Sequence, residues 1–327
     1  MTICVLGCGA WGLAIATVLA HNGHSVIVWC HLPEYAKEIN NYHTNTRYLP
    51  GKILDKKITA TADIHDALSC SDLIFEAIPV QFLRSVITEA RPYYTKNQSW
   101  VILSKGIEQK TLLLPSQIIA TILGPEIESR MAIVAGPSFA HELIEQQPTA
   151  VTLATTHHLL QTQLENLLHT SYFRTYSSTD IIGTQIGGAL KNVIALAIGI
   201  LDGAGYQDNT KSFIVTRSIN EIINITKAVG GSPETILELS GIGDLILTCM
   251  GKSSRNLYVG REFGMGKTLD TIISTTGYTP ESLNTIRSCY ELIQQKNITA
   301  PLITDIYHML FNNLLVKDFI GHNINTR

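Results

Sequence analysis

The motif GCGAWG at residues 7–12 restricts most strongly what the N-terminal part of this chain can fold into. It follows a strand-forming run, TICVL (residues 2–6), and opens a helix-forming run, WGLAIATVLA (residues 11–20), with a second strand-like run at 26–29. In such a unit the first glycine permits the tight turn, the second lets the backbone approach a diphosphate, and the third lets the helix lie close to the sheet. The helix N-terminus adds about half a positive charge. The pattern predicts a dinucleotide-binding βαβ unit.

An export signal and a membrane span are the alternatives, because no Lys, Arg, Asp or Glu precedes Glu34. An export signal needs a basic stretch before its apolar segment, and residues 1–6 have none. A membrane helix of about 20 apolar residues would have to run through three glycines and a change of periodicity. A second apolar run, at 181–201, contains Lys191, which would cost a membrane helix about 2.5–3.5 kcal/mol. We therefore expect both runs in a protein core, without membrane insertion.

The composition fits a globular protein with a large buried core, since 45% of the 327 residues are apolar and 16% are charged. The net charge of −3, without a dense basic tract, argues against nucleic acid as a partner. The six cysteines form no Cys-x-x-Cys pair, and the adjacent His157 and His158 would diverge on a helix. We expect reduced thiols, a cytoplasmic protein and no metal site.

Short apolar runs alternate with helical patterns through the first half of the chain, which predicts an α/β fold with a doubly wound, mostly parallel sheet. The expected strands are 2–6, 25–29, 57–61, 72–78, 100–104, 131–135, 150–154 and 174–177. The expected helices are 11–21, 34–41, 63–69, 81–90, 113–122, 139–145 and 158–168.

Strand patterns end near residue 178, and helical patterns follow. The expected helices there are 181–202, 211–228, 233–239, 281–295 and 303–315, with glycine-rich connectors at 203–205, 241–243 and 260–266. We predict a dinucleotide-binding domain over residues 1–180 and an all-α substrate and catalytic domain over 181–327.

Lys191 has ten uncharged residues on each side, in a helix that is apolar nearly all round. Burial of an ammonium costs several kcal/mol unless it is paired, and it favours proton exchange near neutral pH. The alternative is a lysine whose head reaches water. Asp244, in the glycine turn GIGD, would either pair with Lys191 or cap the next helix. Ser253 to Asn256 (SSRN) would either bind a phosphate or form an N-cap followed by a surface arginine.

Three loops after expected strands contain further candidates for ligand contact, because ligands of open α/β sheets collect beyond the carboxyl ends of strands. SKG at 104–106 and GPS at 136–138 are two of them, although turn chemistry alone explains their Gly and Pro. The third, after the second strand, has His31 where an acidic residue would select NAD. NADP is therefore permitted and NAD is not excluded, since Glu34 could reach the ribose.

Taken in order, these stretches resemble the bacterial NAD(P)-dependent glycerol-3-phosphate dehydrogenases over nearly the whole chain. The matching stretches are GCGAWG at 7–12, YLPG at 48–51, SKGIE at 104–108, AGPSFAHE at 135–142, GGALKNVIALAIGILDG at 187–203, GIGDLILTC at 241–249 and SRN at 254–256.

The resemblance implies an N-terminal Rossmann-type domain, a helical C-terminal domain and a homodimer. It implies NADPH or NADH as cofactor, and the reduction of dihydroxyacetone phosphate to sn-glycerol 3-phosphate, the backbone precursor of phospholipids. The implied catalytic residues are Lys191, as general acid and base, and Asp244. The implied cofactor contacts are Gly7, Gly9, Ala10, Trp11, Gly12, His31, Lys105, Ala140, Arg255 and Glu281. The implied substrate contacts are Lys105, Gly136, Ser138, Lys191, Asp244, Ser254, Arg255 and Asn256.

The chain departs from the family pattern at two of these positions. His31 stands where the family usually has Arg, which leaves the preference between NADPH and NADH open. The stretch TPESL at 279–283 keeps the carboxylate of Glu281 but has Ser282 in place of a glycine. Two other functions stay open from the residues alone: a dehydrogenase for a hydroxy acid, with Arg255 as the carboxylate ligand, and a nucleotide-sensing module without turnover.

Overall fold

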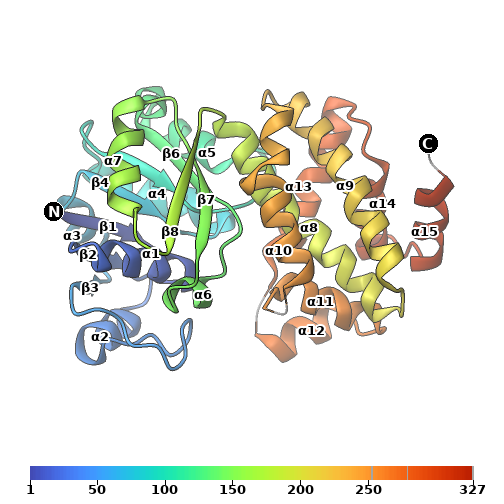
Figure 1. Cartoon of the computed structure of the whole chain (residues 1–327), viewed down its shortest axis with the longest axis horizontal. Coiled ribbons are helices and arrows are strands. Elements are labelled where there is room, and N and C mark those ends of the chain that lie inside the picture. The colour runs from blue at the N-terminus through green and yellow to red at the C-terminus, as the bar shows by residue number, and fades with distance from the viewer. Residues whose placement is uncertain (252, 278, 326–327) are drawn as a thin grey trace. The chain divides into compact units, whose positions relative to one another are not determined.

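The computed structural model describes residues 1–251, 253–277 and 279–325, and the chain divides into two compact units (Figure 1). The first unit comprises residues 1–105 and 115–181, and the second comprises 106–114 and the chain from 182 onward. The short segment 106–114 belongs to the second unit because Ile107 and Leu114 lie in its apolar core. The division into independent domains at residue 180 stays a prediction.

The first unit is built on one eight-stranded sheet, as the alternating pattern predicted. The strand order is β3-β2-β1-β4-β5-β6-β7-β8, and all neighbours are parallel except β6 and β7. The strands are β1 (Thr2–Leu6), β2 (Ser25–Trp29), β3 (Ile58–Thr61), β4 (Leu73–Glu76), β5 (Ser99–Ile102), β6 (Met131–Ala135), β7 (Thr149–Ala154) and β8 (Phe173–Ser178). The strand order reverses at β1, because the chain goes from β1 to β2 and β3 on one side and then to β4 on the other. Sheets of this type bind ligands beyond the carboxyl ends of the strands at such a point.

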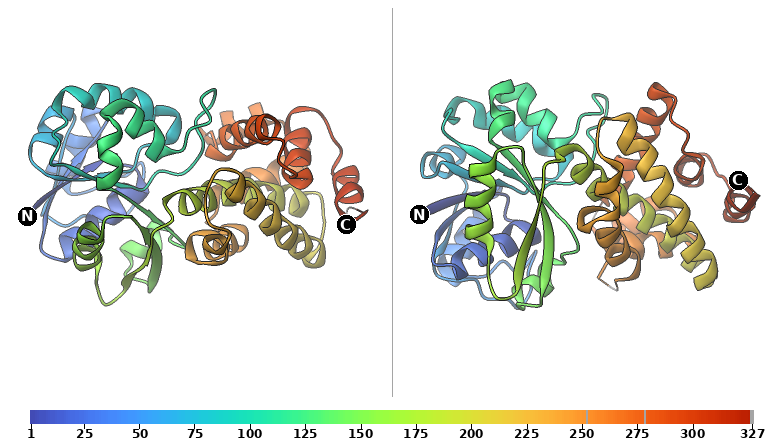
Figure 2. Two further views of the ribbon diagram at one scale, coloured as in Figure 1. Left: turned by 90° about the horizontal axis from the view of Figure 1, so that it is seen from above. Right: turned by 45° about the horizontal axis from the view of Figure 1, so that its top comes forward.

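Helices cover both faces of this sheet, with α3, α4 and α5 on one face and α1, α6 and α7 on the other (Figure 2). Both faces are therefore buried, which explains why the strands lack polar alternation. The helices are α1 (Ala10–His21), α2 (Pro33–Tyr42), α3 (Ile64–Ser69), α4 (Val80–Ala90), α5 (Pro115–Leu123), α6 (Ala140–Ile144) and α7 (His158–Leu168), with short 3-10 helices η1 (Arg91–Tyr93) and η2 (Pro125–Arg130).

The regular elements of the second unit are all helices among its described residues, as predicted. Its elements are α8 (Ile181–Gly203), α9 (Asp208–Ala228), η3 (Pro233–Leu237), η4 (Leu239–Gly243), α10 (Asp244–Met250), α11 (Arg255–Gly264), α12 (Leu269–Thr276), α13 (Glu281–Lys296), α14 (Pro301–Phe311) and α15 (Val316–Asn325). Helix α8 is the one helix of the described ranges with the length and composition of a membrane span, but 83% of its most apolar window is buried. That burial is typical of the core helix of a globular unit.

The glycine-rich segment 260–266 was wrongly predicted as a connector, because Gly260 and Gly264 lie inside α11. A Cβ on Gly260 would collide with the carbonyl of Leu196, and one on Gly264 with the carbonyl of Ile200. A Cβ on Gly199, the glycine of α8 that faces α11, would likewise collide with the carbonyl of Leu257. These glycines therefore serve a close approach of two helix backbones rather than a turn.

We expect Gly260→Ala to lower the free energy of unfolding by about 1–3 kcal/mol, because the added methyl group would force α8 and α11 apart. Urea-induced unfolding followed by circular dichroism measures this change. The control is Gly321→Ala in α15, where a Cβ would meet nothing within 4 Å. That change should be neutral or stabilising by up to about 1 kcal/mol, since alanine favours a helix. Equal effects of the two substitutions would contradict the close packing of α8 on α11.

Candidate active site

Two of the three motif glycines are needed for packing, and the third faces open space. Gly7 has φ +118°, and a Cβ there would lie 2.7 Å from the carbonyl oxygen of Ala77. A Cβ on Gly12 would collide with the carbonyl of Gly7. Gly9 is the N-cap residue of α1, and a Cβ on it would meet nothing within 4 Å. The loop therefore brings backbone, without side chains, to the N-terminus of a helix, which suits a diphosphate.

Asn45 fixes this loop from a neighbouring segment, and the sequence reasoning missed it. Its side chain is fully buried and donates to the carbonyl of Cys8 over 3.3 Å. Its Oδ1 accepts from the backbone N–H of Tyr48 over 3.1 Å. The YLPG stretch is thereby tied to the glycine loop. A polar residue three positions before an aromatic one carries no local pattern that identifies such a long-range contact.

His31 lies just past the end of β2 and is exposed. Its ring is 5.7 Å from that of Tyr35, which in turn lies 5.7 Å from that of Tyr48. Glu34, in the first turn of α2, is also exposed. Neither residue is held by a strong polar contact in the described residues, so this loop contains both a weakly basic and an acidic group for a ribose or its phosphate.

The loops after β4 and β5 are joined by a buried carboxylate, Glu76. Its Oε1 accepts from the backbone N–H of Ile78 over 2.6 Å, and its Oε2 accepts from the hydroxyl of Ser104 over 2.7 Å. Glu76 has no exposed surface, whereas Lys105, the residue after Ser104, is half-buried. The carboxylate thus orders the segment that ends in Lys105, and sequence reasoning did not single it out.

The loop after β6 holds the remaining candidates of the first unit. Gly136 is buried, and a Cβ there would lie 2.8 Å from the Cα of Val151 in β7. The hydroxyl of Ser138 donates to the carbonyl of Gly136 over 2.8 Å. Ala140 begins α6 and is half-buried. The glycine is required by the approach of β7, so its presence does not by itself indicate a ligand.

Lys191 is buried and paired with Asp244, which resolves one of the alternatives that the sequence left open. Its Nζ lies 2.5 Å from Oδ1 of Asp244. The lysine side chain is 11% exposed and the aspartate side chain is fully buried. A charge pair removed from water in this way needs close contact to offset its loss of hydration. The lysine therefore does not extend into bulk solvent, and its ammonium is held at a fixed point.

Glycines set the distance between these two side chains. A Cβ on Gly187, one turn before Lys191, would lie 2.5 Å from the carbonyl oxygen of Ser240. A Cβ on Gly241 would collide with the carbonyl of Ile236. Gly187 thus lets η4 lie directly against α8, Gly241 lets η4 lie close to η3, and α10 then begins with Asp244 at the lysine. The space beside Gly187 is thus filled by the backbone that delivers the carboxylate.

The thiol of Cys249 lies close enough to this pair to feel the charge of Lys191. Burial raises the pKa of Cys249 to about 12, and the positive charge of Lys191 offsets part of that rise. The thiol is therefore protonated at neutral pH, and it cannot compete with Asp244 for the lysine as an anion.

The SSRN stretch forms the start of α11, where Ser254 is the N-cap and accepts from the backbone N–H of Leu257 over 3.3 Å. Arg255 is exposed and Asn256 is buried. Both interpretations of the stretch are thus compatible with the structure, because a capped helix N-terminus with an exposed guanidinium can also bind an anion. Glu281, the first residue of α13, is half-buried.

Comparisons with known proteins fix the family. Residues 2–160 match the model for the N-terminus of NAD-dependent glycerol-3-phosphate dehydrogenase, and residues 180–321 match the model for its C-terminus. The chain is 40% identical, over 96% of its length and 93% of the relative's, to glycerol-3-phosphate dehydrogenase [NAD(P)+] of Lysinibacillus sphaericus. The chain belongs to the NAD-dependent glycerol-3-phosphate dehydrogenase family. It is therefore an NAD(P)-dependent oxidoreductase.

Other members agree with this assignment. The glycerol-3-phosphate dehydrogenase [NAD(P)+] of Bacillus velezensis is 39% identical over 96% of this chain and 91% of its own length. The crystal structure of glycerol-3-phosphate dehydrogenase from Coxiella burnetii superimposes with a TM-score of 0.94 at 30% identity, covering 99% of both chains. The predicted resemblance and the fold class are thereby confirmed, whereas the roles of individual residues stay predictions.

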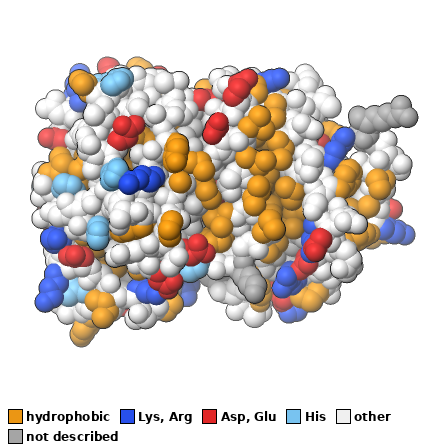
Figure 3. Space-filling view, viewed as in Figure 1, with side chains coloured by type: hydrophobic (Ala, Val, Ile, Leu, Met, Phe, Trp, Pro, Cys, Tyr) orange, Lys and Arg blue, Asp and Glu red, His pale blue; other side chains and the backbone are white. Residues whose placement is uncertain are grey.

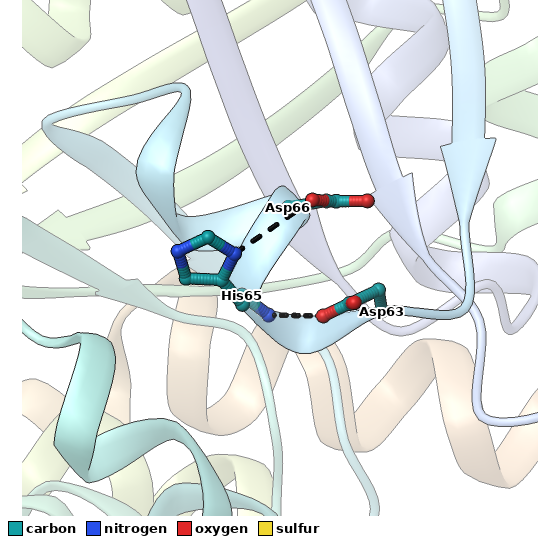
Figure 4. Close-up of side chains that lie close together, drawn as sticks. All are labelled: Asp63, His65 and Asp66. Carbon is teal, nitrogen blue, oxygen red and sulfur yellow. Dashed lines mark hydrogen bonds and ion pairs between the residues drawn. The ribbon is translucent and has the colours of Figure 1, made fainter.

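One exposed cluster in the first unit resembles a metal site. Among the described residues, the one group of three potential metal ligands is Asp63, His65 and Asp66, all exposed (Figure 4). Asp63 is the N-cap of α3 and accepts from the backbone N–H of His65 over 2.8 Å. His65 Nδ1 lies 3.7 Å from Asp66. Helix capping accounts for the cluster.

Proposed function

We propose that this chain catalyses the reversible NAD(P)H-dependent reduction of dihydroxyacetone phosphate to sn-glycerol 3-phosphate and so supplies the backbone of glycerophospholipids. Family membership supports the reaction. The observation that carries the mechanism is the buried ion pair, with Lys191 Nζ 2.5 Å from Asp244. A buried ammonium at a fixed position is the group that a ketone reduction needs beside its oxygen.

Bound NAD(P)H supplies the hydride that reduces the ketone carbon. Lys191, as an ammonium, stabilises the negative charge that develops on the carbonyl oxygen and donates the proton to that oxygen. Asp244 orients the ammonium and favours its charged form. In the reverse direction the neutral amine accepts the proton from the alcohol. Such a general acid contributes about 10²–10⁴-fold to the rate.

The first unit supports cofactor binding by its glycine loop, where a Cβ on Gly9 would meet no protein atom. The proposed contacts around it are Gly7, Ala10, Trp11, Gly12, His31, Lys105 and Ala140. In the second unit, Arg255 and Asn256 at the start of α11 offer a guanidinium and an amide to the phosphate of the substrate. Binding of that remote phosphate positions the reacting carbon. The proposed contacts with cofactor or substrate also include Ser254, Glu281, Gly136 and Ser138.

A cytoplasmic homodimer is part of the proposal. The chain contains six free thiols, which suits a reducing compartment. Exposed apolar side chains of the second unit include Leu237, Ile246 and Met250, and Figure 3 shows apolar side chains gathered in a band over this unit. Contact between two protein chains is one of the uses of such an exposed apolar surface, so the band supports the proposed dimer.

The decisive test of the function follows absorbance at 340 nm with dihydroxyacetone phosphate, separately with NADPH and with NADH. We expect turnover with at least one of them. We also expect kcat/KM for dihydroxyacetone phosphate to exceed that for any short 2-oxo acid by about 100-fold or more, because the phosphate supplies binding energy that a carboxylate at another position cannot. Preference for a 2-oxo acid would identify a hydroxy-acid dehydrogenase instead. Nucleotide binding without turnover of any substrate would indicate a sensor.

A further inference from the structure

A buried polar network joins three helices of the second unit at the proposed phosphate-binding residue. Asn256, at the start of α11, donates from Nδ2 to Oδ1 of Asn192 over 3.0 Å. The hydroxyl of Ser282, in the first turn of α13, donates to Oδ1 of Asn256 over 2.7 Å. Ser282 has no exposed surface, and Asn256 is 8% exposed. Asn192 follows Lys191 along α8, so the network lies in the part of the unit that carries the proposed chemistry.

The direction of these bonds decides which side of the Asn256 amide is available to a ligand. An asparagine side chain has one carbonyl oxygen, which only accepts, and one amino group with two hydrogens, which only donate. The carbonyl oxygen is engaged by Ser282, and one amino hydrogen is engaged by Asn192. The second amino hydrogen has no partner among the residues that the structure describes. The Asn256 side chain therefore keeps one N–H group that can donate a hydrogen bond to an anion.

We propose that Ser282 is a positioning residue that orients the Asn256 amide toward donation, so that the phosphate of the substrate meets an N–H group and not a carbonyl oxygen. The inference rests on the proposed function, in which Asn256 binds that phosphate. A flipped amide would place a partial negative charge against the dianion. It would also set Oδ1 of Asn256 against Oδ1 of Asn192 and lose the bond in which the Ser282 hydroxyl donates to Oδ1. Ser282 itself needs no contact with the substrate, because it is fully buried.

The test compares Ser282→Ala with Ser288→Ala in steady-state reduction of dihydroxyacetone phosphate. Both serines lie on α13 and are fully buried, but Ser288 only donates to the carbonyl of Asn284 in its own helix, over 3.2 Å. Ser282→Ala should raise KM for dihydroxyacetone phosphate about 5- to 20-fold, the range expected when a hydrogen bond to a charged group is weakened. The turnover number and KM for the nicotinamide cofactor should change less than about twofold. Ser288→Ala should leave all three constants unchanged.

A double variant shows whether the effect passes through Asn256. We expect Asn256→Ala to raise KM for dihydroxyacetone phosphate, and Asn256→Ala/Ser282→Ala to give the same KM as Asn256→Ala alone. Independent, multiplying effects would overturn the positioning role. If Ser282→Ala left KM unchanged while Asn256→Ala raised it, this inference would fail and the proposed function would stand. If Asn256→Ala itself left KM unchanged, the phosphate contact would be wrong, and the positioning role with it.

Ser282→Cys gives the same test with the volume of the side chain nearly conserved, in case the alanine variant does not fold. A thiol is a much weaker donor than a hydroxyl, so KM should rise in the same direction as for Ser282→Ala. An unchanged KM in a folded Ser282→Cys protein would contradict the inference.

Discussion

Lys191→Met is expected to lower the turnover number for dihydroxyacetone phosphate by about 10²–10⁴-fold while leaving the dissociation constant for NADPH unchanged. The thioether fills the space of the alkyl chain but supplies neither a positive charge nor a proton to the carbonyl oxygen. The glycine loop that we propose for the cofactor lies in the other unit of the chain. Steady-state kinetics at saturating substrate and cofactor fluorescence measure the two quantities.

The matched control is Lys211→Met in α9, since Lys211 also forms ion pairs, with Asp202 and Asp208, but is 22% exposed. The turnover number of this variant should stay within about twofold of that of the unchanged protein. Loss of Lys191 leaves the carboxylate of Asp244 buried without its cation, which costs about 3–5 kcal/mol, so a lower Tm is expected with it. A folded Lys191→Met protein with a turnover number within tenfold of the original would exclude Lys191 as the proton donor.

Gly9→Val is expected to raise the dissociation constants for NADPH and NADH by at least about 10-fold without lowering Tm. The backbone of Gly9 has φ −68° and ψ 170°, which valine adopts without strain, and a Cβ there would meet no protein atom within 4 Å. The branched side chain would instead occupy the space that the motif reserves for the diphosphate. Titration of intrinsic or cofactor fluorescence measures the affinity.

Gly12→Ala separates cofactor space from protein packing in the same motif. A Cβ on Gly12 would collide with the carbonyl of Gly7 and lie 3.2 Å from the Cβ of Ala77. This substitution should therefore lower Tm by several degrees, since overpacking costs about 1–3 kcal/mol. A Gly9→Val protein that binds NADPH as tightly as the original would contradict the assignment of the loop, whatever Gly12→Ala does.

The sheet of the first unit was predictable because each strand combines β-branched residues with a turn signal at its ends. All eight strands are present, with bounds that differ by at most two residues from those predicted. What the pattern could not give is the direction of β7, which runs antiparallel to β6. Parallel and antiparallel strands have the same composition when both faces are covered, so the direction depends on the connection and not on the strand.

The second unit was less predictable, because glycine has two uses there. At Gly205 it has φ +87° and ends a helix, as expected. At Gly260 it lies inside α11, where the carbonyl of Leu196 comes too close for any side chain. The sequence does not distinguish a glycine that breaks a helix from one that lets two helices touch. No bounds were predicted for α10, α11, α12 and α15, although possible helix starts were noted at Asp244 and at residues 253–256. The first three of these helices are short. The predicted helix 303–315 ended just before α15 begins.

In the candidate site, the buried charged residue was identifiable from the sequence, whereas the neutral polar residues that hold the site in place were not. A lysine amid twenty uncharged neighbours is improbable without a partner, so Lys191 was identified from the cost of burying charge, with Asp244 as one possible partner. Neutral polar residues such as Asn45, Ser282 and Asn192 carry no charge whose burial would make them stand out in the sequence. Their importance comes from hydrogen bonds to residues far along the chain, which only the fold brings together.

The most direct measurement of the central claim is the turnover number of Lys191→Met/Asp244→Leu, in which an apolar pair replaces the buried ion pair. Such replacements preserve or increase stability in other proteins, so a folded variant is expected. We predict that it binds NADPH with unchanged affinity and reduces dihydroxyacetone phosphate at least about 100-fold more slowly than the original. Reduction at a rate within tenfold of the original, by a variant with neither charge, would contradict the account.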